Sequence, residues 1–229
     1  MSSLYKRALF GLMNVSPSIF IYYSPVEVSP LTEHYYSRTQ KVESNPKYWD
    51  FTLKNHLFRF KTDNGVFSKR EVDFGSRLLI DTFQMPETEG LILDVGCGYG
   101  PIGLSIAKDN ENRTVHMIDV NERAIELAKE NAELNRVKNV VIYESDRLIN
   151  VEEKNFAAIL TNPPIRAGKK TVHEIFEQSY HHLVSEGELW VVIQKKQGAP
   201  SAIEKLKELL FEVETIDKSK GYFIIKAKK

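Results

Sequence analysis

Residues 91–103 read Leu-Ile-Leu-Asp-Val-Gly-Cys-Gly-Tyr-Gly-Pro-Ile-Gly. The apolar run Leu91 to Val95 is typical of a buried strand, and a helix is predicted from Ile102. Between them, alternating glycines allow positive φ and let a ligand approach the bare backbone. Taken alone, this cluster could be a tight turn with no ligand. Its place between a strand and a helix favours a binding loop.

The chain around this loop alternates short apolar runs with amphipathic segments. We predict helices over residues 102–108, 122–134 and 171–184, and strands over residues 91–95, 114–119, 140–144, 156–161, 188–194, 211–216 and 222–227. Alternating strands and helices predict a mostly parallel sheet with helices on both faces. The last two strands are joined by residues 218–221, a link too short for a crossover, so they should pair antiparallel. The fold class is therefore α/β and Rossmann-like, with seven strands and a C-terminal antiparallel hairpin.

We expect three parts along the chain. Residues 1–30 have Asn14 and Pro17 within their apolar stretch, which disfavours a signal peptide, and are expected to be disordered or a non-native extension. Residues 31–85 should form an N-terminal extension with a helix and a β-hairpin, the hairpin from residues 51–53 and 57–60. Residues 86–229 should form the main domain.

The composition excludes several classes of protein. The 229 residues carry 31 basic and 31 acidic side chains, which disfavours a dominant polybasic arm. The single cysteine excludes a disulfide framework and a cysteine-rich zinc module. The sequence has no apolar run long enough to suggest a membrane span. The six histidines lack metal-ligand spacing, so we expect no metal. A cytoplasmic protein, with a monomer favoured, is the plain expectation.

Neutrality nevertheless conceals an uneven distribution of charge. Residues 1–70 carry a net charge of +5, residues 71–155 carry −8, and residues 156–229 carry +3. An acidic middle suits a cationic ligand, and basic flanks suit an anionic partner such as RNA.

Acidic residues follow the predicted strands of this middle region. Asp119 ends the strand after the glycine loop, 25 residues beyond Asp94, where a carboxylate can accept both hydroxyls of a ribose. Asp146 follows the third strand, although it could also be a helix cap. Gly98-x-Gly100-x-x-Gly103 fits a dinucleotide fingerprint, which is weak evidence alone. Asp94 and Asp146 would repel a pyrophosphate and attract a cationic ligand.

A second polar element closes the fourth strand at Asn162-Pro163-Pro164-Ile165. In an open parallel sheet it should lie at the same edge as the glycine loop. The Asn162 side-chain oxygen and the Pro163 carbonyl can accept both N–H groups of an exocyclic amine and stabilise its developing positive charge during alkylation. A strand-ending turn without chemistry is the alternative.

These residues carry a resemblance to known enzymes. The stretch from Asp94 to Gly100 resembles the first motif of class I S-adenosylmethionine-dependent methyltransferases. The resemblance implies that Asp94, Gly96, Cys97, Gly98, Gly100, Asp119, Asp146 and Asn162 bind S-adenosylmethionine. By it, the loop passes the methionine end, Asp119 holds the ribose, and Asp146 lies near the adenine amino group. Cys97, without an evident base partner, is interpreted as a small lining residue and not a nucleophile.

Asn162 to Ile165 resembles the Asn-Pro-Pro-aromatic motif of amino-methyltransferases, with Ile165 in place of the aromatic residue. Residues 162–170, together with residues 65–80, resemble the short RsmC-type 16S rRNA guanine-N2 methyltransferases, over a span from about Thr32 to the C-terminus. Residues 31–36 resemble the usual beginning of that family, so the resemblance implies a translation start at Leu31. This resemblance implies catalysis by Asn162 and Pro163 on ribosomal RNA or the assembling small subunit. Base or RNA contacts are expected from Phe67, Pro164, Ile165, Arg166 and Lys169.

Other functions remain open at this point. Within the enzyme class, the amine could belong to an adenine N6 or a protein glutamine. A dinucleotide-dependent oxidoreductase and a catalytically silent RNA-binding module are further alternatives. The presence of Asp94, Asp119 and Asn162 weighs against a silent module.

Overall fold

The computed structural model describes residues 38–40 and 42–229. These residues belong to one compact unit, Glu33–Lys229. The predictions for residues 1–30, including the extension and the start at Leu31, lie outside the described residues. So does His34.

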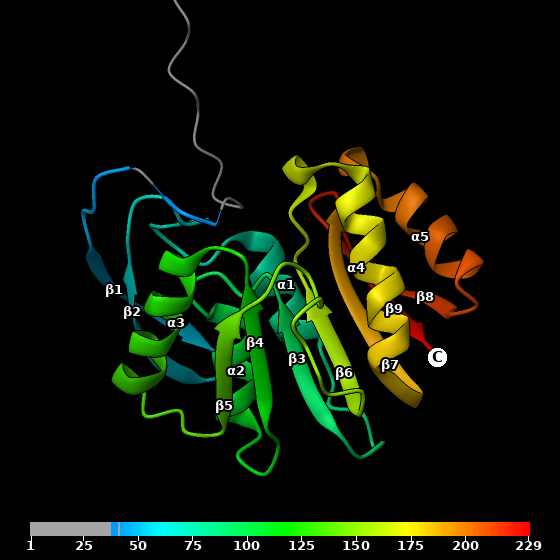
Figure 1. Ribbon diagram of the computed structural model, residues 1–229, viewed down its shortest axis with the longest axis horizontal. Coiled ribbons are helices and arrows are strands. Elements are labelled where there is room, and N and C mark those ends of the chain that lie inside the picture. The colour runs from blue at the N-terminus through cyan, green and yellow to red at the C-terminus, as the bar shows by residue number, and fades with distance from the viewer. Residues whose placement is uncertain (1–37, 41) are drawn as a thin grey trace, which may run out of the picture. The chain divides into compact units, whose positions relative to one another are not determined.

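The centre of this unit is a seven-stranded sheet (Figure 1). Its strands are β3 (Leu91–Val95), β4 (Val115–Asp119), β5 (Val140–Glu144), β6 (Phe156–Thr161), β7 (Leu183–Gln194), β8 (Glu212–Ser219) and β9 (Tyr222–Lys228). They lie in the order β5-β4-β3-β6-β7-β9-β8. The first five are parallel, and β9 pairs antiparallel with both β7 and β8. The predicted Rossmann-like sheet with its C-terminal hairpin is confirmed.

Helices cover both faces of the sheet. On one face, α1 (Phe74–Thr82), α2 (Pro101–Asp109) and α3 (Glu122–Leu134) share a core with the inward residues of β3, β4 and β6. On the other face, α4 (Lys169–His182) and α5 (Ala199–Glu208) cover a second core. Two short 3-10 helices, η1 (Ile165–Ala167) and η2 (Lys195–Gln197), follow β6 and β7.

On this second face the structure differs from the sequence predictions at two places. Helix α5 was not predicted, because its buried residues are chiefly the small Ala199 and Ala202 with Leu206, and Gly198 and Pro200 suggest a turn. The predicted helix over 171–184 ends instead at His182, and β7 begins at Leu183. Leu183 pairs with Phe156 on β6. This pairing extends β7 toward the N-terminus through residues 185–188, a stretch whose sequence is too polar to predict a buried strand.

A two-stranded hairpin, β1 (Lys47–Leu53) and β2 (His56–Thr62), stands beside the main sheet. The predicted hairpin is confirmed, with strands longer than expected. Helix α3 covers the free edge of β2: the Asn131 side chain accepts from Lys61 N at 2.7 Å and donates to Lys61 O at 2.9 Å. Asn135 does the same for the backbone of Arg59. These amides satisfy backbone groups that an edge strand would otherwise leave open.

The hairpin also holds the glycine loop in place. Tyr99, inside the loop, lies edge-on to Phe60 with ring centroids 5.5 Å apart and to Trp49 at 6.0 Å. The Asn131 amide donates a further hydrogen bond to Tyr99 O at 2.9 Å. The N-terminal hairpin is therefore part of the support of the proposed binding loop.

The strand order changes direction at β3, which has β4 on one side and β6 on the other. At such a point the two chain segments leave in opposite directions, and a crevice opens at the carboxyl ends of the strands. The glycine loop follows β3 and Asn162 follows β6, so both lie at this crevice. Within residues 38–40 and 42–229, no helix is long and apolar enough to cross a membrane.

Candidate active site

The glycine loop leaves its backbone exposed toward the crevice. Gly96 and Gly98 have φ of 76° and 57°, and no atom outside their immediate chain neighbours lies within 4 Å of the position a Cβ would take. Gly103 has another role: a Cβ there would lie 2.6 Å from the Met117 side chain of β4. The first two glycines therefore present bare backbone to a ligand, and the third lets α2 pack closely on the sheet.

Asp119 ties the end of β4 to this loop. Its Oδ2 accepts from Gly98 N at 2.9 Å and its Oδ1 from Asn121 N at 2.9 Å. Burial raises the pKa of this carboxyl, and these backbone hydrogen bonds act in the opposite direction. Each carboxylate oxygen can accept a second hydrogen bond. Asp119 can therefore hold the loop and still accept ligand hydroxyls.

Asp94 lies elsewhere than its sequence position suggested. Its side chain is fully buried beneath the loop, where Oδ2 accepts from Gly103 N at 2.8 Å. Its Oδ1 has no hydrogen-bond partner among the described residues. Burial, with a smaller contribution from the charge of Asp119, raises the pKa of Asp94 to about 7. Asp94 thus supports the start of α2 and does not line the hollows described next.

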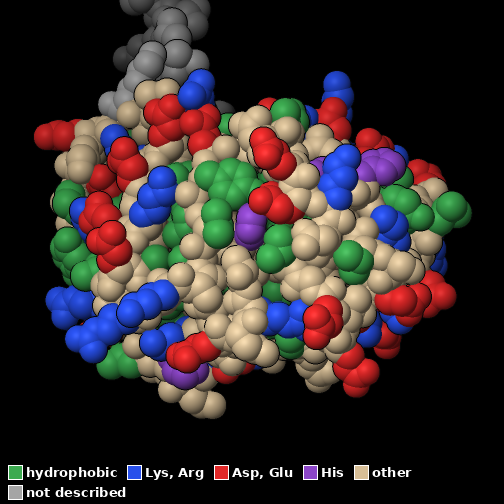
Figure 2. Space-filling view, turned by 60° about the horizontal axis from the view of Figure 1, so that its bottom comes forward, with side chains coloured by type: hydrophobic (Ala, Val, Ile, Leu, Met, Phe, Trp, Pro, Cys, Tyr) green, Lys and Arg blue, Asp and Glu red, His purple; other side chains and the backbone are tan. Residues whose placement is uncertain are grey.

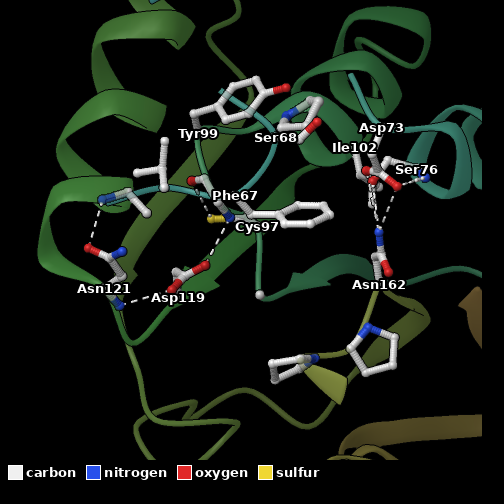
Figure 3. Close-up of a pocket in the computed structure, with 17 residues that line it drawn as sticks. Phe67, Ser68, Asp73, Ser76, Cys97, Tyr99, Ile102, Asp119, Asn121 and Asn162 are labelled. Atoms are coloured by element: carbon white, nitrogen blue, oxygen red, sulfur yellow. Dashed lines mark hydrogen bonds between the residues drawn. The ribbon is translucent and has the colours of Figure 1, made fainter. Parts of the chain in front are cut away.

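Two adjoining hollows occupy the crevice. The first, of about 90 Å³, is lined by Gly96, Cys97, Gly98, Asp119, Phe67 and Asn162, among others (Figure 3). The second, of about 360 Å³, is lined by Ser145 and Asp146, among others. They share Gly96, Asp119 and Pro164. The structure therefore brings most of the predicted cofactor residues to one continuous surface, with Gly100 and Asp94 beneath it.

Asp146 and Cys97 differ in their availability. The Asp146 carboxylate is paired with Arg147 at 2.7 Å, and its side chain is 56% exposed at the rim of the second hollow. Cys97 is buried, and burial raises the pKa of its thiol well above the usual value. A neutral thiol packed in the loop is a poor nucleophile.

Asn162 is held by α1, a partner that sequence reasoning missed. Its Nδ2 donates to Ser76 Oγ at 3.1 Å and lies 3.4 Å from both carboxylate oxygens of Asp73 (Figure 3). Asp73 also caps α1 by accepting from the backbone N–H groups of Gly75 and Ser76. Because an ionised carboxylate only accepts hydrogen bonds, the amide NH₂ must face Asp73. No hydrogen bond within the described residues uses the Asn162 oxygen.

A third hollow meets the first at Asn162, and Asp119 does not line it. Asn162, Pro163 and Phe67 line both this hollow and the first. Its wall includes Ile165, Arg166 and Tyr222, and the Phe67 side chain is 44% exposed. Pro164 remains on the cofactor side, and Lys169 lines a fourth hollow together with Ile165. The expected substrate residues thus extend over more than one depression.

Several groups have no part in this arrangement. The described residues contain no cluster of three or more His, Cys, Asp or Glu side chains that could hold a metal ion. His116 is buried between Tyr143 and Phe156, and burial lowers its pKa. Trp190 packs against Phe83 of the segment after α1.

Comparisons with known proteins agree with this geometry. Residues 57–226 match the family model described as "Methyltransferase small domain". The chain is 66% identical over 200 residues to "Uncharacterized protein YbxB" of Bacillus subtilis, covering 87% of this chain and all of that protein. It is 32% identical over 168 residues to "Ribosomal RNA small subunit methyltransferase C" of Vibrio cholerae, covering 72% of this chain and 48% of that protein.

Among solved structures, the 16S rRNA N2 G1207 methyltransferase (RsmC) of T. Thermophilus, in complex with AdoMet and guanosine, superposes with a TM-score of 0.70. It is 22% identical, and the match covers 83% of this chain and 52% of that chain. The chain thus spans about half the length of the rRNA methyltransferases that it matches. With the family model covering most of its length, the chain belongs to the methyltransferase small domain family.

Proposed function

We propose that this protein transfers a methyl group from S-adenosylmethionine to the exocyclic N2 amine of a guanine in 16S ribosomal RNA. The observation that carries the proposal is the orientation of Asn162. Asp73 and Ser76 bind its amide nitrogen, so its oxygen is left for an N–H donor in the hollow beside the glycine loop. Two relatives described as small-subunit rRNA methyltransferases support the choice of substrate.

The residues of the crevice fit S-adenosylmethionine. The bare backbone at Gly96 and Gly98 can admit the methionine end, and Asp119 can accept ribose hydroxyls through its remaining lone pairs. We expect Asp146, at the rim of the second hollow, to accept from the adenine amino group. When bound, the cofactor supplies a methyl group on a sulfonium, which is an electrophile and a cation. The carboxylates of this side suit that charge.

The target amine needs activation because its lone pair is delocalised into the ring. Asn162 Oδ1 and Pro163 O accept its two N–H groups and favour the geometry in which the lone pair points at the methyl carbon. Pro163 O already accepts from Ile165 N at 2.8 Å and keeps one lone pair. The N–C bond forms as the S–C bond breaks, and the proton leaves afterwards to water. S-adenosylhomocysteine is the second product.

The base itself must be unpaired or rotated out of its helix to reach Asn162. Phe67 and Ile165 provide apolar contact with the faces of the base. They take over the role of the aromatic residue of the Asn-Pro-Pro-aromatic motif, where this chain has Ile165. Pro164 keeps the turn rigid, and Arg166 and Lys169 lie on the exposed side, where phosphates would lie.

The test is methyl transfer by purified protein to 16S rRNA and to small subunits isolated from a strain lacking the gene. Digestion and nucleoside mass spectrometry should show N2-methylguanosine formed by wild type and not by Asn162→Ala. Formation of N6-methyladenosine, or of methylated protein glutamine, would contradict guanine as the substrate. A thermal shift with NAD and none with S-adenosylhomocysteine would contradict the methyltransferase assignment altogether.

A further inference from the structure

A groove continues from the base side of the site toward α5. The third hollow, which contains Asn162, adjoins the fourth, and both are lined by Ile165 and Gln197. The fourth hollow is further lined by residues of α4, β7, η2 and the start of α5. We call the two together the flanking groove, defined by Arg70, Ile165, Arg166, Lys169, His173, Lys196 and Gln197.

The rim of the flanking groove carries unpaired positive charge. Arg70, Arg166, Lys169 and Lys196 are exposed, and none forms an ion pair with another described residue. Two carboxylates, Glu71 and Asp73, line the third hollow, and Asp73 is engaged by Asn162. No carboxylate lines the fourth. The cations there have room for anions from outside the chain.

The positive charge of the fourth hollow comes from its lysines and not from His173. Burial lowers the pKa of His173, and the neighbouring charges of Lys169 and Lys205 lower it further, although Glu177 and Glu208 oppose them. Helix α5 begins at Ala199, after its N-cap Gly198, which has φ of 114° and provides no side-chain cap. Pro200 has no N–H, so Ala199 and Ser201 carry the first backbone N–H groups of this helix, and no side chain caps them.

The floor of the groove is apolar, in contrast to its rim. Ile165, Val172, Ile193 and Ala202 form it. An acidic peptide would complement the charge of the rim, but its carboxylates would not complement an apolar floor that leads to Asn162. A single nucleic-acid strand has both a charged backbone and flat apolar bases, and it matches both features. The end of the molecule where the strands begin shows acidic and basic side chains interspersed instead (Figure 2).

We propose that the flanking groove binds the sugar-phosphate backbone of the nucleotides next to the target base as a single strand. The proposal rests on the function proposed above and specifies its substrate as a nucleotide in a single-stranded segment. The strand reaches the site from one side, between η1 and α5. Arg166, Lys169 and Lys196 contact phosphates, and Ile165 separates the target base from its neighbour.

The experiment compares two matched double variants that each remove two exposed lysines, none of which forms an ion pair with another described residue. The groove variant is Lys169→Gln with Lys196→Gln. The control variant is Lys138→Gln with Lys154→Gln. Lys138 lies two positions before β5 and Lys154 two positions before β6, at the opposite end of the sheet. Binding of a short fluorescein-labelled single-stranded RNA is measured by anisotropy over a series of KCl concentrations. Thermal unfolding and S-adenosylhomocysteine affinity verify that both variants fold.

For the groove variant, the slope of log K against log salt should fall in magnitude by about 1.4, and affinity at 0.1 M salt should fall about 20-fold, since each single-strand phosphate contact contributes about 0.7 to the slope. The control variant should match wild type. Equal slopes for the two variants, or equal losses, would overturn the proposal, as would equally strong competition by poly-glutamate.

The same preparations separate failure of the groove from failure of the proposed function. Wild type that methylates guanine in RNA, with an unchanged KM for RNA in the groove variant, refutes the groove alone. Wild type that binds RNA through the groove and yields no N2-methylguanosine refutes the proposed substrate and leaves the groove standing.

Discussion

The two sides of the site are built in different ways. On the cofactor side, carboxylates bind backbone N–H groups: Asp94 holds Gly103, and Asp119 holds Gly98 and Asn121. On the base side, side chains bind one another, with Asp73 and Ser76 orienting Asn162. Backbone partners are fixed by the path of the chain, whereas side-chain partners depend on helix α1 packing correctly. We therefore expect the cofactor side to govern stability and affinity for the cofactor, and the base side to govern the rate.

The largest expected effect concerns Asp94 and stability. Its pKa of about 7, against an ordinary value near 3.8, means that the folded state favours the protonated acid. Its contribution to stability is fully present below pH 4 and is lost as pH rises through 7, by about 4 kcal/mol at pH 8. Asp94→Asn keeps an acceptor for Gly103 N and should abolish most of this dependence. Urea unfolding between pH 4 and 8 measures it, and parallel pH profiles for wild type and variant would contradict it.

Next in size is the effect of Asn162→Ala on the rate. Loss of a preorganised acceptor at the reacting amine should lower kcat about 10² to 10³-fold, by analogy with removal of one oxyanion-hole donor. Affinity for S-adenosylhomocysteine, measured by calorimetry, should stay within a few-fold, since the cofactor side is intact. A variant with wild-type kcat would refute the role assigned to Asn162, and a large loss of cofactor affinity would break the division between the two sides.

A smaller effect is expected at the positioning residue Asp73. Asp73→Ala removes both the N-cap of α1 and the partner of the Asn162 amide, and should lower kcat about 10 to 100-fold, as outer-shell changes at metal ligands do. Cap loss should cost about 1 kcal/mol of stability. Asp73→Ser keeps a capping oxygen and serves as the control. If it restores both stability and kcat fully, Asp73 acts only as a cap and the orienting role fails.

The smallest expected effect lies at the base contact. Phe67 lines both the first and third hollows with its ring half exposed, so Phe67→Leu should raise KM for RNA by a factor corresponding to about 1 kcal/mol of lost stacking, with kcat nearly unchanged. Ile165→Phe should act in the opposite direction. Steady-state methylation kinetics on 16S rRNA measure both, and an unchanged KM in each would show that neither side chain contacts the base.

The central sheet was predictable from sequence because its signals are local. Each parallel strand is a short apolar run, and the glycine loop with Asp119 marks two of their ends. Helix α3 has a strong cap at Asn121 and a clear apolar side. Helix α5 escaped prediction because its core residues are mostly alanines, and the early start of β7 escaped because pairing with Phe156 overrides its polar sequence.

For the site, local pattern was sufficient to place the Asn-Pro-Pro-Ile turn and the glycine loop on one sheet edge, because the carboxyl ends of parallel strands share an edge. It was not sufficient to tell the depth of Asp94 or to pair Asp73 with Asn162, which lie 89 positions apart. Whether a carboxylate faces the crevice or is buried beneath the loop depends on how α2 packs on β4. Which way the Asn162 amide points depends on how α1 packs beside β6, and only the folded chain brings these segments together.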